Sequence, residues 1–277
     1  MICIAIWLIG VLMHNGKCVR NAVAITGDSF MTRYKVILEY DGTDLIGWQE
    51  NRQGASVQSI MSDAIYAFCG ARPDIVGAGR TDAGVHAVGM VAHFDLPGKT
   101  DANTVMRALN FYLVNKPVSV LDCEIVAGNF NARFDCVARH YIYVVLNRAA
   151  APVLDKKRVW WVPRKLNVSA MKRAATKLIG KHDFTSFRAS ECQAKSPIKT
   201  LDECRITKRG DEIIFEFSAR SFLHHQVRNM VGTLVEIGIG KPYDIEKILK
   251  AKNRSSAGPT APADGLYFVS ADYSNDD

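Results

Sequence analysis

Residues 79–86 read Gly-Arg-Thr-Asp-Ala-Gly-Val-His and contain the residue types of a catalytic loop. One carboxylate, Asp82, follows directly after Arg80 and Thr81. The glycines around it let the backbone turn tightly and approach a ligand closely. The sequence therefore makes Asp82 a candidate catalytic group. The alternative is an ordinary aspartate in a glycine-rich turn between two strands.

Basic residues are concentrated in one stretch of the chain, which has 277 residues and a formal net charge of +7. Residues 133–181 contain twelve lysines and arginines against two acidic residues, a net charge of +10, so the remainder carries −3. This stretch predicts binding to a polyanion, with a solvated basic face as the alternative. Aromatic residues lie among the charges and favour RNA over a membrane, because bases stack on rings. They are Phe134, Tyr141, Tyr143, Trp160 and Trp161.

The cysteines and histidines form no recognisable pattern of disulfides or metal ligands. The seven cysteines are odd in number, scattered, and never spaced Cys-x-x-Cys, which indicates a reducing, cytoplasmic location without a zinc site. His224 and His225 are adjacent, and on a helix their side chains would diverge by about 100°. We therefore expect no metal ion and assign these two histidines no catalytic role.

The N-terminal segment contains the only long apolar run, residues 2–13. It is too short to span a bilayer, and no basic region precedes it as in a secretory signal. Met31 stands directly before the first convincing strand. We expect residues 1–30 to be a poorly ordered, non-essential extension, with a genuine anchoring segment as the alternative.

Hydrophobic periodicity predicts two successive α+β units. The first has strands over 34–40, 75–78, 88–94 and 118–127, and helices over 57–68, capped by Ser56, and 103–112. The second has strands over 141–146, 205–208, 213–217 and 266–273, and helices over 171–179, closed by Gly180, and 227–235. We expect an N-terminal domain, residues 31–135, and a C-terminal domain, residues 136–277. Each is expected to be ferredoxin-like or RRM-like, with an antiparallel sheet and helices on one face.

Six sequence blocks occur in order along residues 33–273. They are Tyr40-Asp41-Gly42-Thr43-Asp44 with Gly47-Trp48-Gln49; the octapeptide; Asn131-Ala132-Arg133-Phe134 with Arg139-His140-Tyr141-Ile142-Tyr143; residues 182–189, HDFTSFRA; residues 222–232, FLHHQVRNMVG; and Ala263-Asp264-Gly265-Leu266-Tyr267. In these blocks the chain resembles the bacterial TruA type of tRNA pseudouridine synthase. Each block alone is weak, whereas the ordered set across both halves is specific.

The resemblance implies an isomerase that detaches a uracil base from its ribose in RNA, turns it, and rejoins it through C5. The implied substrate is the anticodon stem-loop of tRNA, at positions 38 to 40. No cofactor is expected, because the reaction has no redox step and the chain has no P-loop or dinucleotide fingerprint. The resemblance also implies a homodimer with tRNA across both subunits. The alternatives are a catalytically silent RNA-binding protein and a synthase acting on other RNA positions.

The resemblance also assigns roles to individual residues. Asp82 matches the catalytic aspartate, and Arg228 matches the arginine that pairs with it and keeps it ionised. Arg80 matches the residue that assists base flipping and fills the vacated space. Tyr141 matches the aromatic ring that stacks on the flipped base, and Leu266 matches an apolar wall of the pocket. Alternatives are a phosphate or surface contact for Arg228 and plain core packing for Tyr141 and Leu266.

Two further groups complete the expected site, an active-site cleft between the domains. The first group, in the motif that begins at Tyr40, is expected to be structural, with Asp41 in a turn and Trp48 packed near the pocket floor. The second group is basic and is expected to contact RNA: Lys156, Lys157, Arg158 and the loop 193–199.

Overall fold

The structure is a computed structural model, and it describes residues 30–51 and 53–274. The predictions for the N-terminal extension fall on residues 1–29 and lie outside the described residues. None of the helices in the described part is long and apolar enough to cross a membrane.

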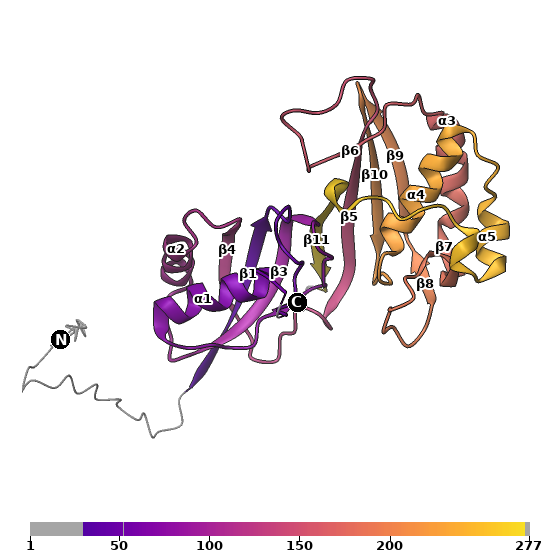
Figure 1. Ribbon diagram of the computed structural model, residues 1–277. Coiled ribbons are helices and arrows are strands. Elements are labelled where there is room, and N and C mark those ends of the chain that lie inside the picture. Colours follow the sequence, from indigo (N-terminus) through magenta and orange to yellow (C-terminus); the bar gives the residue numbers. More distant parts are fainter. Residues whose placement is uncertain (1–29, 52, 275–277) are drawn as a thin grey trace, which may run out of the picture.

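A mixed sheet forms the centre of the fold (Figure 1). Its strands are β1 (Met31–Tyr40), β2 (Val76–Gly77), β3 (His86–Pro97), β4 (Val118–Val126), β5 (Cys136–Leu146), β6 (Trp160–Trp161), β9 (Glu203–Arg209), β10 (Glu212–Ala219) and β11 (Leu266–Tyr273). The main order is β4-β1-β3-β11-β5-β10-β9, with β2 beside β3 and β6 beside β5. In β1, Tyr34, Val36 and Leu38 are completely buried at alternate positions, as the period of two predicts.

The helices cover the two ends of this sheet (Figure 1). Helices α1 (Val57–Cys69) and α2 (Ala102–Tyr112) lie at the β1 and β4 end, whereas α3 (Val168–Ala175), α4 (Gln226–Ile239) and α5 (Ile245–Ala251) lie at the β9 and β10 end. The predicted cap of α1 is confirmed, since Ser56 accepts a hydrogen bond from the backbone of Ser59.

The predicted helix over 171–179 is too long at its C-terminal end. The α-helix ends at Ala175 and continues as a 3-10 turn, Thr176–Leu178. Gly180, with φ of +103°, begins the next strand rather than closing the helix. That strand is β7 (Gly180–Asp183), which pairs with β8 (Ile198–Leu201) in a separate two-stranded sheet. The apolar period of the helix continues to Leu178 because that side chain is also buried, so the pattern alone could not mark the end.

Strand β11 corrects the prediction that the sheets are purely antiparallel. It pairs antiparallel with β5 and parallel with β3, where Tyr267 lies opposite His86 and Phe268 opposite Ala87. The sheet is therefore mixed and continuous across both halves of the chain. A strand between β3 and β5 satisfies backbone N–H and C=O groups that two separate sheets would leave unpaired at their edges.

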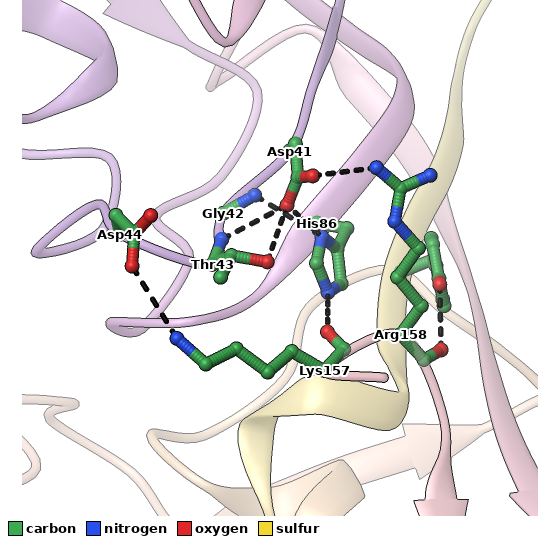
Figure 2. A network of polar contacts seen from close by, with 8 residues as sticks. Asp41, Gly42, Thr43, Asp44, His86, Lys157 and Arg158 are labelled. Atoms are coloured by element: carbon green, nitrogen blue, oxygen red, sulfur yellow. Dashed lines mark hydrogen bonds and ion pairs between the residues drawn. The ribbon is translucent and has the colours of Figure 1, made fainter. Parts of the chain in front are cut away.

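A long connection from the second half of the chain is anchored on the first half (Figure 2). This connection, residues 147–159 between β5 and β6, is called the 147–159 loop below. Arg158 forms an ion pair with Asp41 at 2.7 Å, and Lys157 contacts Asp44 at 3.4 Å. Lys157 adopts a left-handed backbone conformation with φ of +62°.

His86, the last residue of the octapeptide, contacts the backbone of the same loop (Figure 2). The backbone N–H of Gly42 donates to its Nδ1 at 3.1 Å, so Nε2 carries the proton and donates to the carbonyl of Lys157 at 3.0 Å. Tyr267 stacks on the His86 ring and donates its hydroxyl to the carbonyl of Arg158 at 2.6 Å. Hydrogen bonds and ring stacking thus connect the octapeptide, β11 and the 147–159 loop.

Candidate active site

The octapeptide forms the turn between β2 and β3, and its backbone is fixed by the segment that follows β1. Trp48 donates its backbone N–H to the carbonyl of Thr81 at 3.1 Å, and Gly84 donates to the carbonyl of Leu45 at 3.2 Å. Gly84 has φ of +80°, a conformation that glycine adopts without a steric penalty. Asp82 therefore lies on a loop held from two sides.

The side chains of Tyr40, Trp48 and Arg139 also contact this loop. The hydroxyl groups of Tyr40 and Thr81 lie 2.9 Å apart, and Trp48 is buried with its ring against Gly77. Arg139 on β5 donates its Nε to the carbonyl of Ala78 at 2.8 Å. These contacts confirm the structural roles expected of Tyr40 and Trp48.

The structure brings Asp82 and Arg228 into direct contact, although they lie 146 residues apart in the chain. Arg228 Nη1 donates to Asp82 Oδ2 at 2.9 Å. The side chain of Arg228 comes from the first turn of α4, and its Nε donates to the carbonyl of Ala261 at 2.8 Å. This second hydrogen bond fixes the direction of the guanidinium, so the ion pair is held by the backbone as well as by charge.

Two histidines that the sequence left without a role also meet Asp82. His224 Nε2 lies 3.3 Å from Asp82 Oδ1, and His225 Nε2 lies 3.3 Å from Oδ2. The expectation that the two side chains diverge is wrong, because it assumed a helix. His225 precedes α4 as its N-cap and has a left-handed backbone with φ of +61°, and the two ring centroids lie 4.0 Å apart.

The ligand atoms of Asp82, His224 and His225 all lie within 4.8 Å of one another, which is close enough for a shared metal ion. Imidazole nitrogens and a carboxylate are ligands that Zn²⁺ accepts. Arg228, however, already holds one carboxylate oxygen at 2.9 Å and places a positive charge beside any such ion. We therefore interpret the histidines as partners of the carboxylate.

The pKa of Asp82 is lowered from its ordinary value. Burial raises the pKa of this carboxyl, but the contact with His224, the charge of His225 and the contact with Arg228 outweigh that effect. The contact between Asp82 and His224 also raises the pKa of His224, and Asp82 is the chief cause of that rise. Asp82 is therefore a carboxylate, and not a carboxylic acid, at neutral pH.

Tyr141 lies in the core beside the loop. The residue is 8% exposed, and its ring packs edge-on against Phe222 and Phe268, each with ring centroids 5.1 Å away. A Cβ atom placed on Gly79 would lie 3.6 Å from its hydroxyl oxygen, so Tyr141 borders the octapeptide. Burial raises the pKa of this phenol above its ordinary value, which keeps it neutral.

Arg80 and Leu266 occupy opposite environments. Arg80 is exposed, so its side chain is accessible from solvent. Leu266 is buried at the start of β11, opposite Tyr143 in the pairing with β5. The turn before Leu266 approaches the loop closely, since a Cβ on Gly84 would lie 3.0 Å from the Cβ of Ala263.

Comparisons with known proteins identify relatives of this chain. A family model described as tRNA pseudouridine synthase matches residues 174–274. The tRNA pseudouridine synthase A of Paramagnetospirillum magneticum is 52% identical over 246 residues, which cover 88% of this chain and 96% of that protein. The protein of the same name from Rhodospirillum rubrum is 52% identical over 241 residues, covering 86% and 87%. A solved Cbf5-Nop10-Gar1 complex aligns with 73% of this chain and 44% of the matched chain, at 10% identity and a TM-score of 0.34.

Proposed function

This chain belongs to the tRNA pseudouridine synthase A family of isomerases, and from that premise we propose that it converts uridine to pseudouridine in the anticodon stem-loop of tRNA, at positions 38 to 40. Asp82 is the proposed catalytic carboxylate. The observation that carries this proposal is the contact between Asp82 and Arg228 in a chain 52% identical to enzymes of this name.

The reaction needs an ionised carboxylate and a protected site, and no change in oxidation state. The bond from N1 of uracil to C1′ of ribose breaks, a bond from C5 to C1′ forms, the C5 proton leaves to water, and N1 gains a proton. A carboxylate can act at the sugar or at the base only if it is unprotonated. The lowered pKa of Asp82 supplies that state at neutral pH.

Three further residues have proposed roles around the uridine. Arg80 assists extrusion of the base and fills the space it leaves, a role that is supported by its exposure and by its place two residues before Asp82 in the chain. Tyr141 stacks on the extruded base, and its position bordering Gly79 supports this role. Leu266 forms an apolar wall. In the state described, both Tyr141 and Leu266 are largely buried, so RNA binding must expose part of their surface.

We also propose the larger organisation that this function requires. Residues 31–135 form an N-terminal α+β domain that carries Asp82, and residues 136–277 form a C-terminal α+β domain that carries Arg228. The active site lies in a cleft between them. The enzyme works as a homodimer in the cytoplasm and binds one tRNA across both subunits, with the basic stretch 133–181 facing the RNA.

The direct test is release of tritium from tRNA that contains 5-tritiated uridine. Asp82→Asn keeps the shape of the side chain and removes its charge, so release should fall below detection while tRNA binding persists. Asp272→Asn is the matched control, because Asp272 also contacts a histidine, His140, at 2.8 Å but has no contact with Asp82. Full tritium release by Asp82→Asn would overturn the assignment.

The two alternative functions give different results in the same experiment. A catalytically silent RNA-binding protein would bind tRNA, and the unaltered protein would release no tritium. A synthase for other RNA positions would release tritium from a different transcript. Mapping of pseudouridine in tRNA from cells with and without this protein separates that case, since the proposal requires loss at positions 38 to 40.

A further inference from the structure

Three side chains that can carry positive charge converge on one carboxylate. His224 contacts Asp82 Oδ1, whereas His225 and Arg228 contact Oδ2. Arg228 alone would leave Oδ1 without a cationic partner. With His224 present, both oxygens are held, and rotation of the carboxylate about its Cβ–Cγ bond would cost contacts on both sides.

The backbone at His225 is strained in order to make this arrangement. A left-handed conformation is sterically unfavourable in a residue other than glycine. An N-cap side chain usually stabilises the helix by accepting a hydrogen bond from a backbone N–H of the first turn, but the side chain of His225 accepts no such bond from α4. Its ring faces Asp82 instead, 3.3 Å from the carboxylate. Strain that places a side chain at a catalytic group is characteristic of a functional constraint.

The groups that surround Asp82 and the two histidines come from several elements. Arg228 lies on α4, Tyr141 lies on β5, and Glu191 in the segment before β8 acts on both histidines through its charge. Glu191 and Asp82 favour a protonated His224, and Arg228 opposes it, with a net rise in the pKa of His224. Burial lowers the pKa of His225. His224 is therefore the more readily protonated of the two.

We propose that His224, supported by His225, is a positioning residue for the isomerisation: together with Arg228 it holds both oxygens of Asp82 and keeps the carboxylate ionised and fixed in one orientation before RNA binds. This inference rests on the proposed function. It assigns to the histidine pair a role that acts through Asp82 and not by direct contact with the uridine.

The test is the pH dependence of kcat for pseudouridine formation in His224→Ala, His224→Gln and His225→Ala. Loss of His224 removes a partner that lowers the pKa of Asp82, so the acid side of the profile should move to higher pH by about one unit. At neutral pH, His224→Ala should lower kcat about tenfold with little change in KM. His224→Gln keeps a hydrogen-bond donor but no charge. It should recover most of the neutral-pH rate and still show the shifted acid side.

Asp272→Asn is the matched control, because Asp272 also pairs with a histidine, His140, and lies outside the basic stretch 133–181. If His224→Ala and His225→Ala show the same acid-side pH dependence as Asp272→Asn and change only KM, the histidines contact RNA and the inference is wrong. A carbon-13 titration of the Asp82 carboxyl in the free protein needs no activity. An unchanged Asp82 pKa in His224→Ala would overturn the inference, whereas an inactive unaltered enzyme would overturn the proposed function.

Discussion

Gly47 lets the segment after β1 lie directly against the backbone of the catalytic loop. It has φ of +105°, and a Cβ at this position would lie 2.5 Å from the carbonyl oxygen of Thr81. No side chain fits at that distance unless the backbone moves. The loop that carries Asp82 therefore depends on a residue that does not touch the carboxylate.

Gly47→Ala should displace the loop and lower both stability and activity. The strain of a left-handed alanine costs about 1–2 kcal/mol, and the clash with Thr81 adds to it. Gly98→Ala is the control, since Gly98 has φ of +73° but open space around its Cβ position. Urea denaturation and kcat should show that Gly98→Ala loses stability only, whereas Gly47→Ala loses more stability and most of its activity. Equal losses in both variants would show that the clash is relieved without moving the loop.

At this scale the sequence predicted the residues with a distinctive motif and missed those that depend on backbone conformation. The Asp82 and Arg228 contact was expected from the resemblance, and the structure places the two side chains 2.9 Å apart. His224 and His225 were missed because adjacent residues on a helix diverge. Histidine as a residue type does not predict a left-handed backbone at position 225.

At the scale of elements, the 147–159 loop changes what the basic residues can do. Arg158 and Lys157 were expected to contact RNA, but both face acidic residues of the first half of the chain, Asp41 and Asp44. Lys156 is exposed. It is therefore the cation of this loop best placed to bind a phosphate without breaking an existing contact.

Lys156→Glu should weaken tRNA binding and reduce the salt dependence of the affinity by about one unit of slope, with unchanged stability. Arg158→Glu should also lose stability, because it places a second acid beside Asp41. Filter binding at several salt concentrations, with urea denaturation of each variant, separates the two effects. The double variant Asp41→Arg with Arg158→Asp restores the ion pair and should regain stability. A Lys156→Glu protein with unaltered affinity and slope would place the RNA elsewhere.

Elements with strong local signals were predicted well. Helix α1 has its cap at Ser56 and a glycine after its last residue, Gly70, in a left-handed conformation, which together mark both ends. The short strands β7 and β8 and helix α5 were not predicted. A strand of four residues contains too few alternations to differ from a loop, and its pairing is decided by partners distant in the sequence.

At the scale of the whole molecule, β11 joins the two halves in one sheet, so we expect them to unfold together. Phe268 in this strand is fully buried and lies opposite both Ala87 in β3 and Tyr141 in β5. Truncation of such an aromatic side chain costs about 3–5 kcal/mol. Phe268→Ala should therefore destabilise both halves together.

Tryptophan fluorescence can test this, because Trp48 reports on the first half and Trp160 on the second. In single-tryptophan proteins, both probes should give the same urea midpoint, and Phe268→Ala should lower both midpoints equally. Leu121→Ala is a suitable comparison, since Leu121 lies on edge strand β4 and is 46% exposed. Two separate midpoints in the parent protein would indicate domains that unfold independently.

The predicted strands and helices of both halves were largely confirmed, but their assembly was not readable from the sequence. Periodicity marks 266–273 as a strand and says nothing of its neighbours. The parallel pairing of Tyr267 with His86 joins residues far apart in the chain, and no local pattern encodes such a pairing. Only the apolar character of β11 indicated that it belongs inside the fold.

The central place of β11 has a consequence for synthesis on the ribosome. About 120 residues separate the end of β5 from the start of β11, so roughly 6–24 s of translation pass between them. During that interval the nascent chain holds β3 and β5 with open edges that another chain can pair with. The completed active-site geometry is thus a late event of biosynthesis, and ribosome-associated chaperones should bind this nascent chain most strongly just before residues 266–273 emerge.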